Sequence, residues 1–481
     1  MIDLTSPLTD LVRSLERREV SARELLDAHL ARIEALDGPI NAVVTFAAER
    51  AAADAAAVDE RRAAGDELGP LAGVPTTIKD AIATEGIRST GGAVELADHV
   101  PAEDATVVRT VRGAGAVVFG KTNLPRWSGD VQSYNEMFGT TNNPWDLERT
   151  PGGSSGGAAA AVAMGFSAFE IGTDIGGSVR IPASSCGVYG HKPSFGLIPT
   201  HGYLDHVSHH RNVADVNVFG PLARSIDDLE MLVDLLAGPN DDDAAAWQLE
   251  LPPARATELA DFRVAAWVDD SLTPLDPEVR AVLDDALVRL EAAGARIDHD
   301  RRPALDAPTE AIRGMGLISA ATDVSDAVDD TPPSGPDLIS HVQWDLMHRR
   351  RNDARRGWAE FFEHTDVLLC PVQPVPPIRH LHDPGGSNWR NSVLVDHGGR
   401  PYLDLALWTS FVGSAYLPVT VPPVGRTASG LPIGVQIVAP YLHDRTALAF
   451  ARAIEPVVGG YAAPPASPAP DLTHRGGHLN S

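Results

Sequence analysis

The sequence predicts an α/β fold, because short apolar strands alternate with helices along the chain. Residues 74–80 form a short strand-like run that ends in the charged pair Lys79-Asp80. A helix predicted at 104–115 is followed directly by an apolar strand at 116–119. From 150 to 199 Gly, Ala and Ser dominate, with a compact alanine helix and then another apolar strand. Such alternation is typical of helices layered on a β-sheet.

The other elements are predicted from local signals at their ends. A capping box from Ser21 to Glu24 begins the first helix. Asp104 is expected to cap the helix that follows it. Pro277 at the start and Gly294 just past the end bound a later helix. The remaining expected elements are a helix near 47–64 and strands at 263–268 and 368–371.

Shifts in composition predict a catalytic core that is built from two separated parts of the chain. The apolar, glycine-punctuated texture of the first half gives way to a more polar region after Gly238 and returns after about 400. The expected segments are an N-terminal helical segment at 1–65, a catalytic core at 66–238, an inserted variable cap at 239–400, the completion of the core at 401–458 and a flexible tail at 459–481.

The charge of the 481-residue chain is strongly negative, at −26. A surface of this sign repels nucleic-acid phosphates and anionic lipids, so no nucleic-acid partner and no membrane partner is expected. No run approaches the roughly 18 apolar residues that a membrane helix needs. The first residues also lack the basic and apolar regions of a secretory signal. We therefore expect a cytoplasmic protein.

Metal and cofactor sites are not expected from the cysteines and histidines. Two cysteines, Cys186 and Cys370, exclude a disulfide framework and a cysteine zinc site by count. His206, His209 and His210 form a small cluster, but it lacks the helical spacing and the supporting carboxylate of a metal site. The sequence therefore predicts neither a metal nor a cofactor.

Chemically informative residues gather in three segments: the pair Lys79-Asp80, the glycine–serine run 152–157, and the run 172–182 around Ser178. A serine hydroxyl is a weak nucleophile unless a base removes its proton. No His or Asp flanks Ser178 in a way that suggests the usual base, and a Gly-x-Ser-x-Gly elbow is missing there. A lysine can serve instead if burial keeps it neutral.

The two glycines before Ser178 indicate an oxyanion hole. Ile175, Gly176 and Gly177 place consecutive backbone N–H groups directly before the serine. Glycine allows backbone dihedrals that other residues avoid, so these N–H groups can converge on a negatively charged oxygen.

These motifs resemble those of the amidase signature family, in particular its stand-alone bacterial members. The similarity is carried by TPGGSSGGAAAAVAMGFSAFEIGTDIGGSVRIPASSCGVYGHKP, from Thr150 to Pro193, and by GVPTTIKD, GAVVFGKTNLP and GLPIGVQIVAP elsewhere. The resemblance covers nearly the whole chain. It implies a large, mixed, twisted sheet surrounded by helices, with an inserted cap region.

The resemblance also implies a Ser–Ser–Lys triad. Ser178 would attack the carbonyl carbon, Ser154 would relay the proton through a cis peptide after Gly153, and Lys79 would be the base. The implied oxyanion hole consists of Ile175, Gly176, Gly177 and Ser178, with Ser155 and Asp174 as supporting residues.

Substrate-pocket residues are the least constrained part of the prediction. Several residues lie in segments that border the acyl or leaving-group pocket in the family, and ordinary core packing is the alternative for each: Trp127, Gln132, Met137, Trp389 and Trp408. His206 is expected in a loop near the mouth of the pocket.

The expected function is a serine amidase that hydrolyses the C–N bond of a small, uncharged aryl or alkyl amide. Esters and carbamates are open to the same chemistry. The alternative is the glutamine-hydrolysing A subunit of a transfer-RNA-dependent amidotransferase, which passes ammonia to a partner protein. Because the N-terminal helices of family members often pair subunits, a homodimer is expected for the stand-alone enzyme.

A remote alternative is a nucleotide-binding protein. Gly115 to Thr122 matches the phosphate-loop pattern Gly-x4-Gly-Lys-Thr. The four variable positions, however, form the apolar strand predicted at 116–119, and a helix precedes them. The pattern therefore lacks the strand, loop and helix that a phosphate loop needs.

Overall fold

The computed structural model describes residues 2–204, 213–322, 339–382 and 392–465, and it has the predicted α/β architecture. A mixed sheet of nine described strands forms the centre, in the order β10-β9-β11-β16-β14-β7-β8-β6, with β15 paired to β16. The pairs β10–β9 and β9–β11 are parallel, and the remaining pairs are antiparallel. The strands are β6 (Glu170–Asp174), β7 (Tyr189–Lys192), β8 (Val218–Ala223), β9 (Arg263–Ala266), β10 (Arg296–Asp298), β11 (Val367–Pro371), β14 (Val419–Val421), β15 (Pro423–Arg426) and β16 (Pro432–Val438).

A smaller sheet lies beside strand β6 and carries the predicted lysine. Its strands are β1 (Val43–Phe46), β3 (Val117–Thr122) and β2 (Pro75–Lys79), with β2 and β3 parallel. Thr76 Oγ1 donates a hydrogen bond to Phe169 O at 2.8 Å, and Thr77 N–H donates to Ser167 Oγ at 3.0 Å. These bonds hold β2 against the segment that leads into β6. Two short hairpins complete the strands: β4 (Tyr134–Asn135) with β5 (Gly139–Thr140), and β12 (Val393–Leu394) with β13 (Arg400–Pro401).

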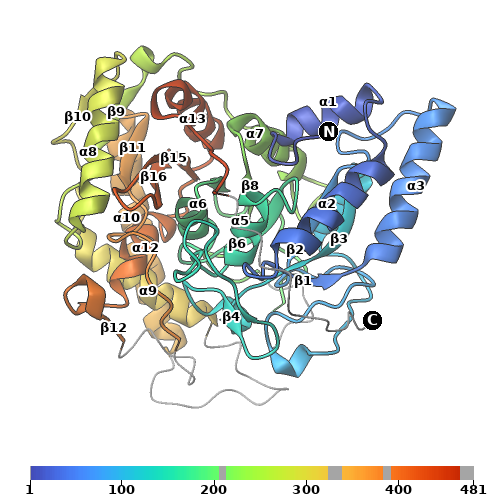
Figure 1. Ribbon diagram of the computed structural model, residues 1–481. Helices are drawn as coiled ribbons and strands as arrows, with labels where there is room; N and C mark the ends of the chain where they lie inside the picture. The colour runs from blue at the N-terminus through green and yellow to red at the C-terminus, as the bar shows by residue number, and fades with distance from the viewer. Residues whose placement is uncertain (1, 205–212, 323–338, 383–391, 466–481) are drawn as a thin grey trace.

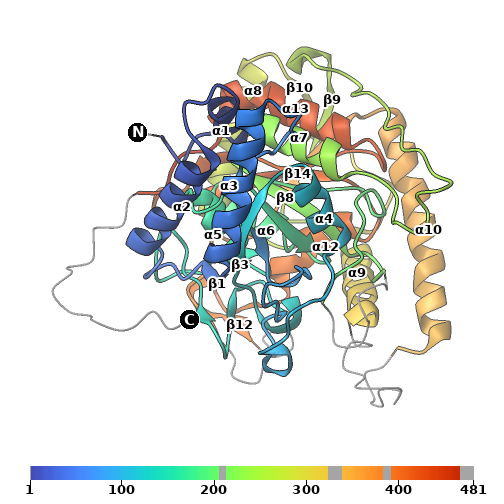
Figure 2. The same ribbon diagram turned by 90° about the vertical axis from the view of Figure 1, so that its right-hand side faces the viewer.

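Helices surround the sheets on both sides (Figure 1). Figure 2 shows α1 to α3 on one side of the molecule and α10 on the opposite side. Every residue of α5 and α6 is buried, so these two helices form part of the core. The helices are α1 (Leu8–Glu16), α2 (Ala22–Leu36), α3 (Ala48–Ala64), α4 (Thr106–Gly113), α5 (Gly156–Ala163), α6 (Arg180–Cys186), α7 (Ile226–Leu236), α8 (Pro277–Ala292), α9 (Ala307–Thr322), α10 (His341–Glu363), α12 (Asp404–Gly413) and α13 (Asp444–Val458).

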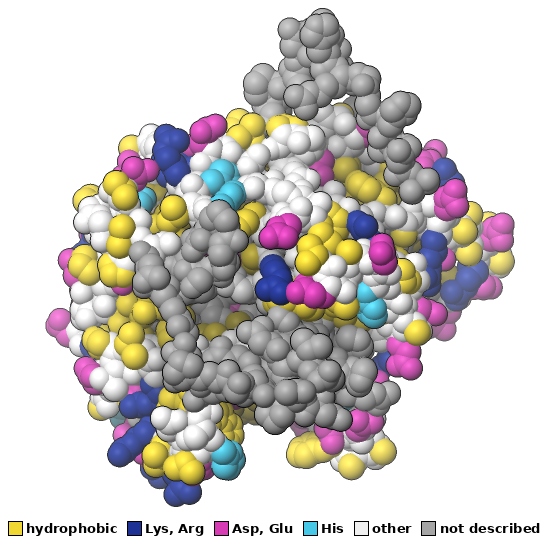
Figure 3. Space-filling view, turned by 90° about the horizontal axis from the view of Figure 1, so that it is seen from below, with side chains coloured by type: hydrophobic (Ala, Val, Ile, Leu, Met, Phe, Trp, Pro, Cys, Tyr) yellow, Lys and Arg dark blue, Asp and Glu magenta, His cyan; other side chains and the backbone are white. Residues whose placement is uncertain are grey.

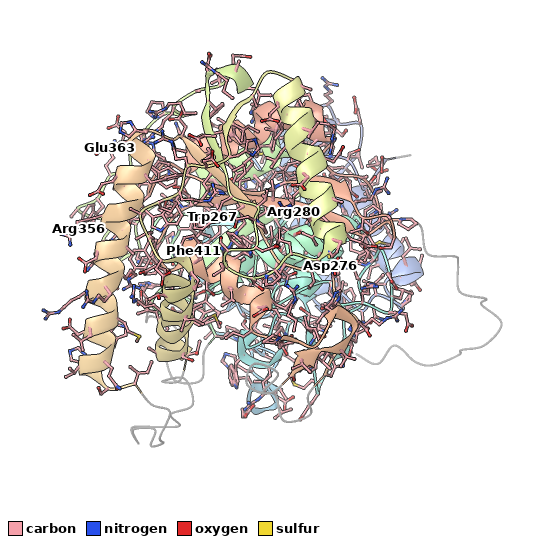
Figure 4. All side chains as sticks on the ribbon, turned by 90° about the vertical axis from the view of Figure 1, so that its left-hand side faces the viewer. Trp267, Asp276, Arg280, Arg356, Glu363 and Phe411 are labelled. Atoms are coloured by element: carbon pink, nitrogen blue, oxygen red, sulfur yellow. The ribbon has the colours of Figure 1, made fainter. Side chains whose placement is uncertain are left out.

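The region 239–400 contributes strands to the main sheet as well as covering helices. Strands β9, β10 and β11 come from it and extend the sheet beyond β16. Helices α8 and α10 lie over this end, and Trp267 and Phe411 point toward one another beneath them (Figure 4). Their rings meet edge to face with centroids 5.4 Å apart. This aromatic contact ties the region to helix α12 of the C-terminal part.

Most of the local signals are confirmed. The capping box of Ser21 and Glu24 is present at the start of α2, and Pro277 begins α8. The cap expected from Asp104 is wrong, because Ala105 occupies the N-cap position of α4. Asp104 accepts instead from Arg112 at 2.8 Å and from the Glu85 N–H at 2.7 Å. In the described part of the chain, none of the helices has both the length and the apolarity to span a bilayer.

Candidate active site

Lys79 is the last residue of β2, and its amino group lies inside the protein. The side chain is completely buried. Its Nζ donates to Ser154 Oγ at 2.6 Å and to Thr173 Oγ1 at 2.6 Å. The two acceptors lie 75 and 94 residues further along the chain, so the fold brings three separate segments to this amine.

The surroundings of Lys79 favour its neutral form. Burial lowers the pKa of Lys79 well below its ordinary value, while the carboxylates of Asp174 and Glu170 oppose that shift. Burial also raises the pKa of Glu170 to about 7, against the hydrogen bonds from Thr77 and Thr122. A partly protonated Glu170 opposes the shift of Lys79 less than a full carboxylate would. Burial therefore favours the neutral form of the Lys79 amine, which is the form that can accept a proton.

In the glycine–serine run 152–157, neighbouring backbone leaves no room for a side chain at Gly153 or Gly157. A Cβ on Gly153 would lie 2.5 Å from the backbone N and O of Gln132, and one on Gly157 would lie 2.5 Å from the backbone of Asn123. The peptide bond between Gly153 and Ser154 is cis, as the resemblance implies. The run is therefore a fixed backbone element that presents Ser154 to Lys79.

Ser178 lies in the loop between β6 and α6, and 7% of its surface is exposed. Its carbonyl accepts a hydrogen bond from the Ser155 N–H at 3.1 Å. Ser155 Oγ in turn donates to Thr173 O at 3.2 Å. These contacts join the loop of Ser178, the glycine–serine run and the end of β6, so the structure brings together the three segments that the sequence singles out.

Asp174 fixes the loop that leads to Ser178. One carboxylate oxygen accepts from the Gly177 N–H at 2.8 Å, and the other accepts from the Val179 N–H at 3.1 Å. Arg180 forms an ion pair with the same carboxylate at 2.8 Å, and both side chains are completely buried. Burial raises the pKa of Asp174, but the Arg180 guanidinium, the Lys192 charge and the Val179 N–H together outweigh burial, so the pKa lies below its ordinary value. Asp174 is therefore an ionised anchor for the loop.

This anchoring narrows the set of candidate oxyanion donors. Gly177 adopts φ = +128°, a conformation that favours glycine, and its N–H is already committed to Asp174. Of the four predicted donors, the N–H groups of Ile175, Gly176 and Ser178 have no hydrogen-bond acceptor among the described residues. These three are the candidates that a substrate oxygen can use.

The predicted pocket residues occupy different settings. Trp127 and Met137 are half-buried, whereas Gln132 is fully buried. Gln132 Oε1 accepts from the Leu381 N–H at 2.9 Å, and Gln132 Nε2 donates to Leu381 O at 2.5 Å. The Gln132 side chain therefore holds the backbone at Leu381 in place. Trp408 has no exposed surface and meets Trp267 edge to face at 5.8 Å, which places it in core packing. His206 and Trp389, with His209 and His210, lie outside the described residues.

The segment that matches a phosphate loop is strand β3. Lys121 of this segment is fully buried, and its Nζ donates to Ile82 O at 2.5 Å and to Thr84 Oγ1 at 2.7 Å. A phosphate-binding lysine needs to reach a ligand from a loop. The structure therefore gives Gly115–Thr122 a structural part.

Sequence reasoning missed three residues that contact this site. Thr173 accepts from Lys79, and Glu170 lies within electrostatic reach of it. Thr409 of α12 donates through Oγ1 to Gly176 O at 2.6 Å. Thr173 and Glu170 belong to the strand of the signature region, so the motif itself could have pointed to them. Thr409 lies 233 residues from Gly176, and no local pattern connects the two.

Comparison with known proteins agrees with this fold. The family model described as Amidase matches residues 24–348 and 337–448. The A subunit of glutamyl-tRNA(Gln) amidotransferase from Moorella thermoacetica is 34% identical, over 93% of this chain and 95% of the relative. The protein of the same name from a Roseiflexus species is 33% identical, over 94% and 96%.

Solved structures include stand-alone hydrolases. A bacterial aryl acylamidase of the amidase signature family aligns with a TM-score of 0.80 at 26% identity, over 94% of this chain and 96% of its own. A 6-aminohexanoate cyclic dimer hydrolase in complex with substrate aligns with a TM-score of 0.78 at 28% identity, over 95% and 98%. The protein is thus an enzyme of the amide-hydrolysing class. It belongs to the amidase signature family.

One sequence-based prediction is contradicted by these relatives. The negative charge led to the expectation that nucleic acid plays no part, yet relatives that cover nearly the whole chain are named as subunits of a glutamyl-tRNA(Gln) amidotransferase. Net charge governs only direct contacts between this chain and phosphates, because other chains of an assembly can supply a basic surface. Figure 3 also shows acidic and basic side chains interspersed over one face, so the net charge does not describe each local surface.

Proposed function

We propose that the chain hydrolyses an amide bond through an acyl-enzyme on Ser178, with Ser154 as the proton relay and Lys79 as the base. The observation that carries the proposal is the 2.6 Å hydrogen bond between Lys79 Nζ and Ser154 Oγ in a fully buried setting. Burial keeps the pKa of the amine low, so it can take a proton. A neutral lysine beside a serine is the arrangement that a serine nucleophile without histidine requires.

The first half of the reaction forms the acyl-enzyme. Ser178 Oγ bonds to the amide carbonyl carbon while its proton passes to Ser154 Oγ, and the Ser154 proton passes to Lys79 Nζ. The carbonyl oxygen becomes an oxyanion, which the free N–H groups of the Ile175–Ser178 loop stabilise. The C–N bond then breaks as Lys79 returns its proton through Ser154 to the departing nitrogen.

The second half releases the acid. A water molecule attacks the ester carbon, and its proton follows the same route through Ser154 to Lys79. The bond between Ser178 Oγ and the acyl carbon then breaks, and Lys79 returns the proton through Ser154 to Ser178 Oγ. Each residue ends in the state in which it began, so the cycle balances without a cofactor.

Glutamine is the substrate that the comparisons favour. Curated relatives with 32–34% identity over 92–94% of the chain carry the name of the amidotransferase A subunit. In this version of the proposal Ser178 takes the glutamyl group, and ammonia leaves for a partner protein that uses it. This interpretation has better support than the small uncharged amide expected from the sequence.

A small uncharged aryl or alkyl amide is the second candidate. It is favoured by the solved structures of an aryl acylamidase and of a 6-aminohexanoate cyclic dimer hydrolase, which align over 94–95% of the chain. The same tetrahedral chemistry extends to esters and carbamates.

The test is hydrolysis of a panel that contains glutamine, aryl anilides, aliphatic amides, carbamates and esters. The wild type is compared with Ser178→Ala and Lys79→Ala. Both variants are expected to lose turnover by at least about 1000-fold on any substrate that the wild type cleaves. Full activity of Ser178→Ala would refute the mechanism. Preference for glutamine over every anilide would support the first substrate, and the reverse order the second.

A further inference from the structure

We propose that Thr409 of helix α12 is a positioning residue for the oxyanion loop, which we define as Ile175–Ser178. The proposal rests on the function proposed above. Thr409 Oγ1 lies 2.6 Å from Gly176 O, the shorter of its two hydrogen bonds. The residue has no role in proton transfer and enters the site from a distant part of the chain.

The peptide between Gly176 and Gly177 is held at both of its polar groups. Thr409 donates to its C=O, and Asp174 Oδ1 accepts from its N–H at 2.8 Å. A glycine backbone turns easily, since no Cβ restricts it. Fixing this peptide plane limits rotation about Gly176, and it thereby limits the direction in which the Gly176 N–H points. Preorganised donors of this kind stabilise an oxyanion without reorganisation during the reaction.

Helix α12 is itself fixed, so Thr409 can serve as a rigid support. Trp408 and Phe411 lie on either side of Thr409 in the sequence and pack edge to face on Trp267, at 5.8 and 5.4 Å. Arg180 Nη1 donates to Thr409 O at 2.8 Å, which links the helix to the residue that pairs with Asp174. Both anchors of the glycine peptide thus belong to one buried network.

The close approach of Thr409 is a second reason, beside the positive φ of Gly177, for glycine at this point of the loop. A Cβ on Gly177 would lie 2.7 Å from Thr409 Oγ1, so a side chain there would displace the hydroxyl. The competing explanation is that the Thr409 hydroxyl only stabilises its own helix, because Thr409 Oγ1 also lies 3.0 Å from Ala406 O in α12. A helical role predicts a change in stability, whereas a positioning role predicts a change in turnover.

The experiment compares three variants. Thr409→Val removes the hydroxyl at nearly constant volume, and Thr409→Ser keeps it. Ser414→Ala is the matched control, because it removes a hydroxyl that bonds to Phe411 O within the same helical segment, at 3.4 Å. The readouts are kcat and KM for the best substrate of the panel and the rate at which a fluorophosphonate modifies Ser178, followed by intact-protein mass.

Thr409→Val is expected to lower kcat and the rate of phosphonylation by about 10- to 100-fold, with KM changed by less than about threefold, because misdirected donors weaken only the transition state. Thr409→Ser and Ser414→Ala should stay within about threefold of the wild type in every readout. If Thr409→Val fails to fold, Thr409→Ala removes the same hydroxyl and gives the same comparison.

A Thr409→Val or Thr409→Ala enzyme with wild-type kcat would overturn the inference and leave the proposed function standing. An equal loss in Thr409→Ser or Ser414→Ala would also overturn it, since that result means a general loosening of α12. A wild type that cleaves amides without any modification at Ser178 would instead refute the proposed function.

Discussion

Lys79 and Lys121 lie on neighbouring strands of one small sheet, and both side chains are completely buried. Only Lys79 donates a hydrogen bond to Ser154, the proposed proton relay. Lys79 is opposite Thr122 in the pairing of β2 with β3, and Lys121 is opposite Ile78. Side chains alternate between the faces of a sheet, so this offset of one residue sends the two amines to opposite faces.

The acceptors on each face then decide what the amine can do. Lys79 donates to two hydroxyl groups, Ser154 and Thr173, which can themselves pass on a proton. Lys121 donates to the carbonyl of Ile82 and to Thr84 Oγ1. Burial lowers the pKa of Lys121 to about 8, and the nearby Asp80 carboxylate opposes the shift. Both amines are buried and both donate to a hydroxyl, so the feature that distinguishes Lys79 is its contact with Ser154, the proposed proton relay.

The sharpest test of this comparison replaces each lysine with methionine. Lys79→Met should lower turnover by about 1000-fold or more, because the proton from Ser154 then has no acceptor. Its stability should change by less than about 2 kcal/mol, since a neutral buried amine is replaced by an apolar chain of similar size. The measurements are kcat on the best amide of the panel and urea unfolding.

Lys121→Met should give the opposite result. Removing this amine leaves the buried Asp80 without its nearby cation, which is expected to cost about 3 kcal/mol or more. The folded fraction should keep turnover within about fivefold of the wild type. If Lys121→Met loses turnover as Lys79→Met does while remaining stable, the division between a catalytic and a structural lysine is wrong.

The same contrast shows what could be predicted from the sequence. Short motifs contain Lys79, Ser154 and Ser178, and the residue types in these motifs indicate the chemistry. The three segments lie in contact, as expected from the sequence. The strand and helix order of the signature region is also local, since buried apolar runs and glycine turns define it.

Features that depend on exact loop geometry, on competing side-chain partners or on distant contacts could not be predicted in this way. The hydrogen bond from the Gly177 N–H to Asp174 depends on the loop conformation, and the two glycines of the loop allow several conformations. The contact of Thr409 with Gly176 joins positions that share no pattern. Asp104 has the right residue type for a cap, but Arg112, two turns further along the helix, competes for its carboxylate. Partners could not be derived from net charge, because charge describes one chain and not an assembly.

A third buried lysine extends the comparison to stability. Lys192 of β7 donates to Pro193 O at 3.0 Å and to Leu417 O at 2.8 Å, and burial lowers its pKa to about 7. Unfolding returns the amine to its ordinary pKa, so the unfolded chain binds one more proton between the two values. Stability from this residue is therefore present at high pH and is lost as pH falls toward 7.

The measurement is the free energy of unfolding of the wild type minus that of Lys192→Met, at several values between about pH 7.5 and 9.5. The difference should rise with pH by on the order of 1 kcal/mol per unit, since one proton is involved. A flat difference would mean that the buried Lys192 amine stays charged in the folded protein.

The smallest expected effect is on the pH dependence of the reaction itself. Lys79 must be neutral to act, so kcat/KM should rise as pH rises through its lowered pKa and fall on the acid side. The Glu170 carboxylate favours the charged form of Lys79, so Glu170→Gln should lower that pKa further and move the acid limb to lower pH. The shift should be less than about one unit, because Glu170 is the weaker of the two carboxylates that oppose the lowering of the Lys79 pKa. A move to higher pH would contradict this electrostatic effect of Glu170 on Lys79, because the carboxylate charge can only favour the protonated amine. An acid limb that Glu170→Gln leaves unchanged would assign the limb to another group.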